Sequence, residues 1–390
     1  MASRWRDERA LVRGAQDGSR ADLERIEIPG AGEVEERARL VLGTAFDEHH
    51  PERRSARRSR RPLIAAVAVL AIVAGALSPP GRALVDTVRR TLGIDHARPA
   101  LFSLPARGRL LVHSDDGLWI ASADGSRRFL GRYEMGSWSP LGRYVVAARA
   151  NELAALDARG GIRWTLARPH VLFPRWSGDA VDTRIAYLSA SRLHVVAGDG
   201  TGDVDAGGLA AAAPVAPAWQ GGFGFAVAYA DTRGRVSSFL TSKGALLWRA
   251  APLAGIRSLE SSTDAKQLLV LADDAVEVID ASNGKVVRRR GAPGVVAAAF
   301  RPGSHAIATL HDGAAGSRVL LGGRTLFSFA GELRGLTWSP DGRWLLVGSP
   351  ASDQWVFVRA DGRRIVAVSN VSAQFHSRSF PRVEGWCCGT

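Results

Sequence analysis

Residues 338–347 read W-S-P-D-G-R-W-L-L-V. An aromatic residue is followed there by a tight turn on Pro340, Asp341 and Gly342, and then by strand-forming residues. Proline fixes φ at the first corner of such a turn, and glycine tolerates the positive φ required later in it. Nearly the same phrase occurs earlier in the chain, where residues 138–146 read W-S-P-L-G-R-Y-V-V. These two copies indicate that one structural unit is repeated along the chain.

Four weaker copies of the phrase lie between these two. Strand-forming residues follow their turns at 184–188, 225–229, 267–271 and 305–310. The six lead residues are Trp138, Trp176, Trp219, Leu259, Phe300 and Trp338. Their spacings are 38, 43, 40, 41 and 38 residues, a regularity that chance recurrence of a common turn would not keep. A period near forty residues with several short strands predicts an all-β propeller, whose blades stack because one blade cannot bury both of its faces.

The first blade lacks an inner strand of its own. Three strands are predicted at residues 109–112, 118–122 and 127–130, and no W-S-P-like phrase precedes them. Residues 380–386 end in Trp386, 48 residues after Trp338. We therefore predict that this last strand completes the first blade, which closes the ring and removes an exposed edge. Seven blades follow, or six if residues 259–293 are irregular.

The W-S-P-D-G-R phrase resembles the repeat of Tol-type, WD-repeat-like propellers of bacterial cell envelopes. The resemblance covers roughly residues 100–390 and implies the propeller fold. Because propellers host many unrelated tasks, it implies no particular activity.

The composition fits a folded protein, with 46% hydrophobic and 23% charged residues. The net charge of +13 comes almost wholly from arginine, since lysine occurs only at 243, 266 and 285. The basic residues are scattered among acidic neighbours and do not form a stripe interleaved with aromatic residues. We therefore predict no nucleic-acid partner.

The first 61 residues form a charged segment with no strand pattern. An amphipathic helix is predicted at about residues 32–48, and the residues that would share its apolar face are Val34, Ala38, Val41, Leu42, Ala45 and Phe46. Such a helix could bind a cytoplasmic partner, or the segment could be a loosely ordered tail.

Residues 62–78 are predicted to be a single transmembrane anchor. Residues 63–77 are uncharged and apolar, and with Pro62 and Ser78 the stretch reaches the lower limit of about 17 residues for a span. A secretory signal peptide is the rival, because Ala74-Gly75-Ala76 resembles a cleavage site, but a leader of about sixty residues is too long for one. A buried core helix is disfavoured by the arginines alongside.

Flanking charge predicts the orientation of this anchor. Six arginines lie in residues 53–61, whereas only Arg82, Arg89 and Arg90 follow within a comparable distance. The positive-inside rule places the N-terminus in the cytoplasm and the propeller outside the cell membrane. Residues 79–107 are predicted to be a juxtamembrane helix, at 81–94, and a linker, and residues 108–390 the propeller.

Motifs that mark common active sites are absent from the sequence. There is no G-x-S-x-G, H-E-x-x-H, P-loop or CxxC pattern, and the glycine-rich residues 221–224 lie in a predicted turn that opens no helix. The Asp115-Asp116 and Asp273-Asp274 turns lack the alternating ligands of a calcium loop. His49-His50 has no cysteine nearby that would complete the zinc motif of some membrane-bound anti-sigma factors.

Other chemistry-bearing residues are assigned structural roles. The repeated tryptophans are predicted to pack the blades, because they recur at one phase of the repeat. His113, His194 and His305 lie in predicted strands. Cys387 and Cys388 are predicted to be free thiols or to cross-link two chains, since a bond between neighbours would be strained. We assign no catalytic, cofactor-binding or metal residues and predict no cofactor.

Three functions remain open at this point. The leading one is a non-enzymatic, membrane-anchored module whose propeller face recognises a protein, peptide or glycan of the cell envelope. The second is a one-pass regulator, similar in architecture to anti-sigma factors, in which residues 1–61 bind a cytoplasmic protein. The third is an enzyme with a site in the propeller channel.

Overall fold

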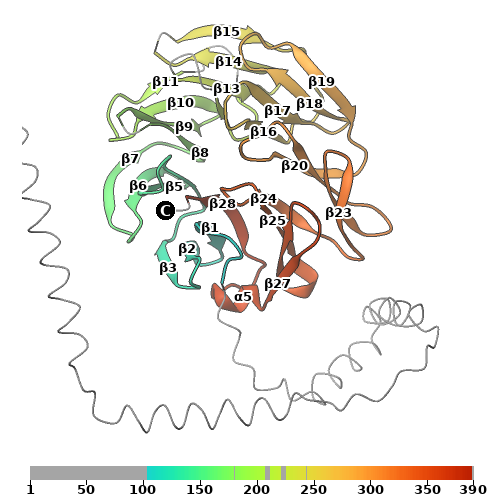
Figure 1. Ribbon diagram of the computed structural model, residues 1–390. Helices are drawn as coiled ribbons and strands as arrows, with labels where there is room; N and C mark the ends of the chain where they lie inside the picture. Colours follow the sequence, from blue (N-terminus) through green and yellow to red (C-terminus); the bar gives the residue numbers. More distant parts are fainter. Residues whose placement is uncertain (1–102, 180, 207–210, 221–224, 243, 389–390) are drawn as a thin grey trace, which may run out of the picture. The chain divides into compact units, whose positions relative to one another are not determined.

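The computed structural model describes residues 103–388 except 180, 207–210, 221–224 and 243. Their 28 strands form seven four-stranded antiparallel sheets. Figure 1 shows these sheets as the blades of a ring, with β8, β16, β20, β24 and β28 on the inside. Strands β4 and β12 hold the same place in the order of their own sheets. The fold is therefore a seven-bladed all-β propeller, as predicted.

Each blade runs from an inner strand to an outer one. Blade 1 contains, in that order, β28 (Arg382–Cys387), β1 (Arg109–Ser114), β2 (Gly117–Ser122) and β3 (Arg127–Gly131). Blade 2 contains β4 (Met135–Trp138), β5 (Tyr144–Arg149), β6 (Glu152–Asp157) and β7 (Ile162–Ala167). Blade 3 contains β8 (Val171–Gly178), β9 (Thr183–Ser189), β10 (Arg192–Ala197) and β11 (Val204–Asp205).

The remaining blades follow the same order. Blade 4 contains β12 (Ala218–Gln220), β13 (Ala226–Ala230), β14 (Val236–Leu240) and β15 (Ala245–Arg249). Blade 5 contains β16 (Ser258–Ser261), β17 (Gln267–Leu271), β18 (Ala275–Asp280) and β19 (Val286–Gly291). Blade 6 contains β20 (Val295–Phe300), β21 (Ile307–His311), β22 (Ser317–Leu321) and β23 (Arg324–Phe329). Blade 7 contains β24 (Arg334–Trp338), β25 (Trp344–Ser349), β26 (Gln354–Arg359) and β27 (Ile365–Ser369), and two short helices, η2 (Pro350–Ser352) and α5 (Val371–Gln374), follow β25 and β27.

The C-terminal strand closes the ring, as the sequence predicts. Strand β28 pairs antiparallel with β1, and Trp386 lies opposite Leu110 (Figure 1). Blade 5 is a regular four-stranded sheet, so the six-blade alternative is wrong. One predicted strand starts too early: β21 begins at Ile307 and not at residue 305, because the turn after β20 closes through a bond from the Arg301 N–H to the Ala306 carbonyl.

A buried serine fixes the turn that follows an inner strand. In blade 7 the Trp344 N–H donates to Ser339 Oγ at 2.9 Å, and the Ser339 N–H donates to the Trp344 carbonyl at 2.8 Å. Ser139 repeats both bonds in blade 2, at 3.0 and 2.9 Å. The glycine of the motif has φ +63° at Gly342, the left-handed region that glycine enters without strain. The W-S-P-x-G phrase therefore encodes a turn whose backbone groups are satisfied internally.

The core lies between blades. Leu345 and Val347 of blade 7 pack with Leu310 and Val319 of blade 6 in one buried cluster, together with Trp338. Outer strands add a contact that the repeated motif does not predict. The indole N–H of Trp164 donates to the Gly198 carbonyl of the following blade at 3.0 Å, and that of Trp248 donates to the Ala281 carbonyl at 2.7 Å. Each blade is thus held on both faces by its neighbours.

Three sequence predictions lie outside the described residues. They are the helix at 32–48, the transmembrane anchor at 62–78 and the juxtamembrane helix at 81–94. Within the part of the chain that the structure describes, no helix has the length and apolar character that a membrane crossing requires.

Candidate recognition cleft between blades 2 and 3

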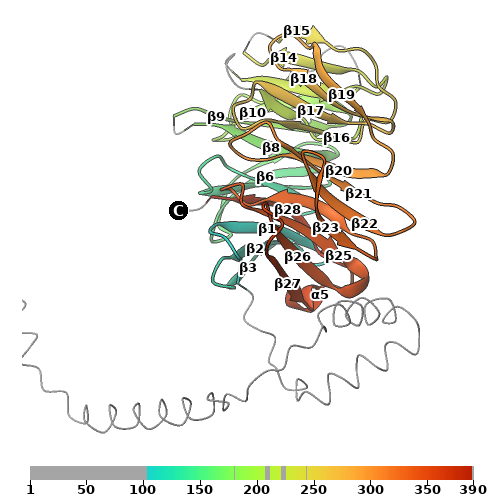
Figure 2. The same ribbon diagram turned by 45° about the vertical axis from the view of Figure 1, so that its right-hand side comes forward.

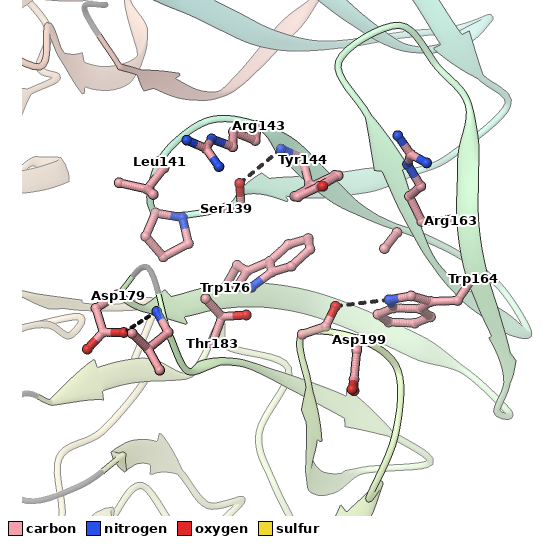
Figure 3. A pocket seen from close by; sticks show the side chains of 14 residues that line it. Ser139, Leu141, Arg143, Tyr144, Arg163, Trp164, Trp176, Asp179, Thr183 and Asp199 are labelled. Carbon is pink, nitrogen blue, oxygen red and sulfur yellow. Dashed lines mark hydrogen bonds between the residues drawn. The ribbon is translucent and has the colours of Figure 1, made fainter.

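A cleft of about 420 Å³ opens between blades 2 and 3, on the side of the ring that carries the turns after the inner strands. One wall is formed by the β4–β5 turn and by β7, and the other by β8 and the turns that follow β8 and β10. Figure 3 shows the cleft with Trp176 between these walls. We name it the 2/3 cleft.

Aromatic side chains dominate the 2/3 cleft. The Tyr144 and Trp176 rings are stacked, with centroids 6.2 Å apart and planes 20° apart. Trp164 is held by the bond from its indole N–H to the Gly198 carbonyl, drawn in Figure 3. A Cβ at Gly200 would lie 2.8 Å from the Trp164 ring, so glycine there lets the turn approach the indole closely. The aromatic surface is therefore positioned before any partner arrives.

The rim of the 2/3 cleft exposes large apolar side chains. Leu141 at the tip of the β4–β5 turn is 50% exposed, and Val181 on the opposite turn is 95% exposed. Tyr144, which also lines the cleft, is 37% exposed. Neighbouring apolar groups that remain in water mark interaction sites more often than isolated ones do.

Two arginines and two aspartates also line the cleft. Arg163 forms an ion pair with Asp157, with Nη2 3.3 Å from Oδ2, and its Cζ lies 5.9 Å from the centroid of the Tyr144 ring. Arg143 forms no ion pair among the described residues. The aspartates are already used by their own turns, since Asp179 Oδ1 accepts bonds from two N–H groups and Asp199 Oδ1 accepts bonds from Thr201. The site therefore offers an apolar aromatic floor with basic groups, Arg143 and Arg163, and two carboxylates that are anchored by their own turns through Oδ1.

The lead tryptophans occupy two kinds of environment. Trp138 and Trp338 are buried at 8% and 6% exposure, as packing residues should be. Trp176 and Trp219 are only partly buried, and Trp176 lines the 2/3 cleft. Position in the repeat therefore determines the strand but not whether the ring faces a neighbouring blade or open space.

The histidines and acidic turns singled out in the sequence are engaged in local structure. The His194 ring stacks on the Tyr187 ring, with centroids 5.3 Å apart, and its Nδ1 lies 3.6 Å from Asp203 Oδ2. His305 Nε2 lies 3.1 Å from Asp264 Oδ1. His305 lies in a turn and not in the strand predicted for it. Asp115 accepts bonds from the Arg378 and Ser379 N–H groups. In the described part of the chain no three His, Cys, Asp or Glu side chains are grouped as a metal site would need.

The sequence left the state of the two cysteines open. The structure joins Cys387 and Cys388 by a disulfide between neighbours. The backbone turns into the left-handed region at Cys388, directly after β28, which lets neighbouring side chains meet. The Cys388 sulfur then lies 3.9 Å from the Pro140 carbonyl, beside the β4–β5 turn.

Charged side chains also converge from different blades on the ring's centre. Arg175 on β8 interacts electrostatically with Glu260 on β16 and Glu384 on β28. Glu260 Oε1 accepts the Phe300 N–H at 3.0 Å, and burial raises the pKa of Glu260 to about 8. Glu384 is held by Arg382 on its own strand, at 2.6 Å. Sequence reasoning missed this cluster, because its members share no linear motif.

Comparison with known proteins gives likeness of fold only. No protein-family model matches the sequence, and no curated protein matches it. Hydrazine synthase of Kuenenia stuttgartiensis matches at 16% identity over 59% of this chain and 77% of that chain, with a TM-score of 0.46. The C-terminal WD40 domain of Sif2 matches at 14% identity over 72% and 83%, with a TM-score of 0.49. A chain of the mitotic checkpoint complex matches at 14% identity over 60% and 77%, with a TM-score of 0.46.

Proposed function

We propose that this protein is a recognition module whose 2/3 cleft binds an apolar side chain of a protein partner. The observation that carries the proposal is the prearranged aromatic surface of Tyr144, Trp164 and Trp176 beneath exposed Leu141 and Val181. Binding would remove these groups from water, and each buried large side chain contributes about 1.5–3 kcal/mol. Rigid aromatic anchors of this kind dominate the energetics of protein interfaces.

The polar groups at the 2/3 cleft favour a protein over a glycan. Sugar recognition would need several free hydrogen-bonding groups beside the rings, but the turns of Asp179 and Asp199 already use one oxygen of each carboxylate. Arg143 instead offers a cation next to the apolar floor. We therefore expect the preferred partner segment to place a carboxylate near a bulky apolar residue.

A charge at the rim of the 2/3 cleft tests the proposal. The double variant Leu141→Asp/Val181→Asp should weaken capture of cell-envelope proteins by the full chain about tenfold or more, because it removes apolar contact and introduces unpaired carboxylates. Quantitative affinity capture, compared with the wild type, measures the effect. Both positions are exposed, so the fold should be preserved.

The matched control carries the same two charges elsewhere. Val204 on β11 is 50% exposed and Ile365 on β27 is 47% exposed, and neither lines the 2/3 cleft. Val204→Asp/Ile365→Asp should retain the captured proteins. Equal losses in both double variants, or no loss in either, would contradict a specific role of the 2/3 cleft.

We further propose that the module is a single-pass protein of a bacterial cell envelope, related to Tol-type propellers. The support is the W-S-P-D-G-R repeat and the apolar residues 63–77 behind six arginines. Protease added to intact spheroplasts should then digest the propeller while residues 1–61 stay protected. Protection of the propeller in these cells, with digestion only after lysis, would refute this topology.

The alternative functions have no support of their own among the described residues. Residues 1–61, which would carry an anti-sigma-like activity and bind a cytoplasmic partner, lie outside them. The Arg175, Glu260 and Glu384 cluster brings charge to the ring's centre, but its carboxylates are held by Phe300 and Arg382. An enzyme activity in the channel stays a prediction from the fold.

A further inference from the structure

A second cleft, of about 320 Å³, lies between blades 5 and 6. Strands β18 and β19 of blade 5 form one wall, and β21 and β22 of blade 6 form the other. Both views show β19 at the outer margin of its blade, next to blade 6 (Figures 1 and 2). We name this the 5/6 cleft; it shares no lining residue with the 2/3 cleft.

The blade 5 wall carries two arginines without carboxylate partners. Arg288, Arg289 and Arg290 follow one another on β19, where every residue is exposed. Side chains alternate along a strand, so Arg289 points away from the cleft and pairs with Glu277 at 3.0 Å and Asp274 at 3.3 Å. Arg288 and Arg290 line the cleft, and neither forms an ion pair within the described residues.

The blade 6 wall adds hydrogen-bonding groups to the cleft, at Thr309 and His311. His311 lies opposite Arg318 in the register of β21 and β22. Burial lowers the pKa of His311, and the charge of Arg318 lowers it further, so the imidazole is neutral at pH 7. Its Nε2 lies 3.1 Å from Thr309 Oγ1. The wall therefore offers polar groups, and Arg318 adds a positive charge beside His311, outside the lining of the cleft.

The floor between these walls is apolar. Val276 and Val278 of β18 face Ile307 and Leu320 of blade 6. A phosphate backbone would leave such a surface uncovered, whereas an extended peptide that presents both acidic and apolar side chains on one face would cover both the floor and the arginines. The combination favours an acidic peptide over a nucleic acid.

The free edge of β19 extends this surface. Strand β19 pairs only with β18 among the described strands, so its outer N–H and C=O groups are available. Val286 and Val287, at the start of the strand, are 45% and 54% exposed. Three consecutive arginines oppose edge-to-edge pairing of two copies of this chain, because like charges would meet. They do not oppose an acidic strand, which could add to the edge by β-augmentation.

We propose that the 5/6 cleft and the edge of β19 bind an extended acidic segment of a partner protein, with carboxylates on Arg288 and Arg290 and apolar side chains on the floor. The carboxylates would complete charge-assisted, bidentate bonds that these arginines lack within the described chain. The proposal is independent of the 2/3 cleft, since the two sites differ in location and chemistry.

A synthetic peptide of repeated Glu-Glu-Val-Val, labelled with a fluorophore, serves as the probe, because an extended chain of this sequence presents both residue types on each face. The full chain should bind it in fluorescence anisotropy, and added salt should weaken binding. Arg288→Glu/Arg290→Glu should weaken binding about a hundredfold, and Arg288→Gln/Arg290→Gln about tenfold, because reversal adds repulsion to the lost attraction. Both arginines are exposed, so circular dichroism should be unchanged.

Three controls determine whether the 5/6 cleft is responsible. Arg128→Glu/Arg363→Glu changes the net charge equally at two exposed arginines of blades 1 and 7, and should bind as the wild type does. A peptide of glutamine and valine should bind at least about tenfold more weakly. Leu141→Asp/Val181→Asp should leave binding of the probe intact, which separates this proposal from that for the 2/3 cleft.

Several results would overturn the proposal. They are failure of the wild type to bind the acidic probe, equal losses in the two charge-reversal doubles, or equal binding of the glutamine peptide. Tighter binding of a single-stranded DNA of equal charge would replace the acidic peptide with a nucleic acid as the partner.

Discussion

Truncation of the chain before Phe380 should abolish cooperative folding of the propeller. The truncation removes β28, the inner strand of blade 1, and leaves the edge of β1 unpaired. It also removes Trp386, which is 8% exposed and packs against Phe357 of blade 7, with ring centroids 5.6 Å apart. Loss of one large core aromatic residue alone costs about 3–5 kcal/mol, and the strand's ladder is lost with it. A domain with ordinary stability would not retain its native state after such a loss.

Urea denaturation followed by tryptophan fluorescence measures this effect. The matched control is a chain that ends at Cys388, which keeps β28 complete and should unfold as the full chain does. A second variant, Trp386→Ala, keeps the backbone ladder and should lower the free energy of unfolding by about 3–5 kcal/mol. A truncated chain with an unchanged unfolding midpoint would show that β28 does not hold the ring closed.

Glu260 should lower the stability of the protein as the pH rises from about 4.5 to about 8, against the opposite effect of His113 and His311, whose pKa values burial lowers. Burial raises the pKa of this carboxyl from 4.5 to about 8 in the folded protein, against the opposing effects of the Phe300 N–H and Arg175. Between those values the folded state holds a proton that the unfolded state has released, so the free energy of unfolding decreases with increasing pH. This loss of stability is absent below about pH 4.5 and complete above about pH 8. Partial solvent screening reduces the full linkage energy to roughly 2–3 kcal/mol.

Glu260→Gln should remove the Glu260 contribution to this pH dependence, leave that of the histidines, and make the protein more stable than the wild type at pH 8. The glutamine amide oxygen can still accept the Phe300 N–H, so the bond between blades 5 and 6 is retained. Denaturant unfolding across this pH range measures the difference. Glu332→Gln, at an exposed carboxyl paired with Arg334, should leave the slope unchanged. Parallel pH profiles for Glu260→Gln and the wild type would disprove that the Glu260 carboxyl is protonated in the folded state.

The sequence alone predicted the fold and its closure. Backbone chemistry of the W-S-P-x-G turn is local: a proline, a serine and a glycine at fixed spacing set φ and satisfy the turn's own N–H groups, whatever lies nearby. Because the turn recurs at intervals of about forty residues, its positions predict where the inner strands end. The unmatched first blade and the unmatched Trp386 then predicted the closure, and the pairing of β28 with β1 confirms it.

Only the tertiary structure decided which of these residues face open space. Trp138 and Trp176 hold the same position in the repeat, yet Trp138 is buried and Trp176 lines a cleft, because exposure depends on the neighbouring blade. The sequence does not distinguish the three consecutive arginines of β19. In the structure Arg289 points to the face that carries Glu277, whereas Arg288 and Arg290 point to the other face, where they form no ion pair with a described carboxylate. Arg175 and Glu260 meet at the ring's centre from strands that are far apart in the chain. Periodicity follows from local chemistry and can be seen in the sequence, whereas surfaces arise from packing between distant segments, which the repeat does not encode.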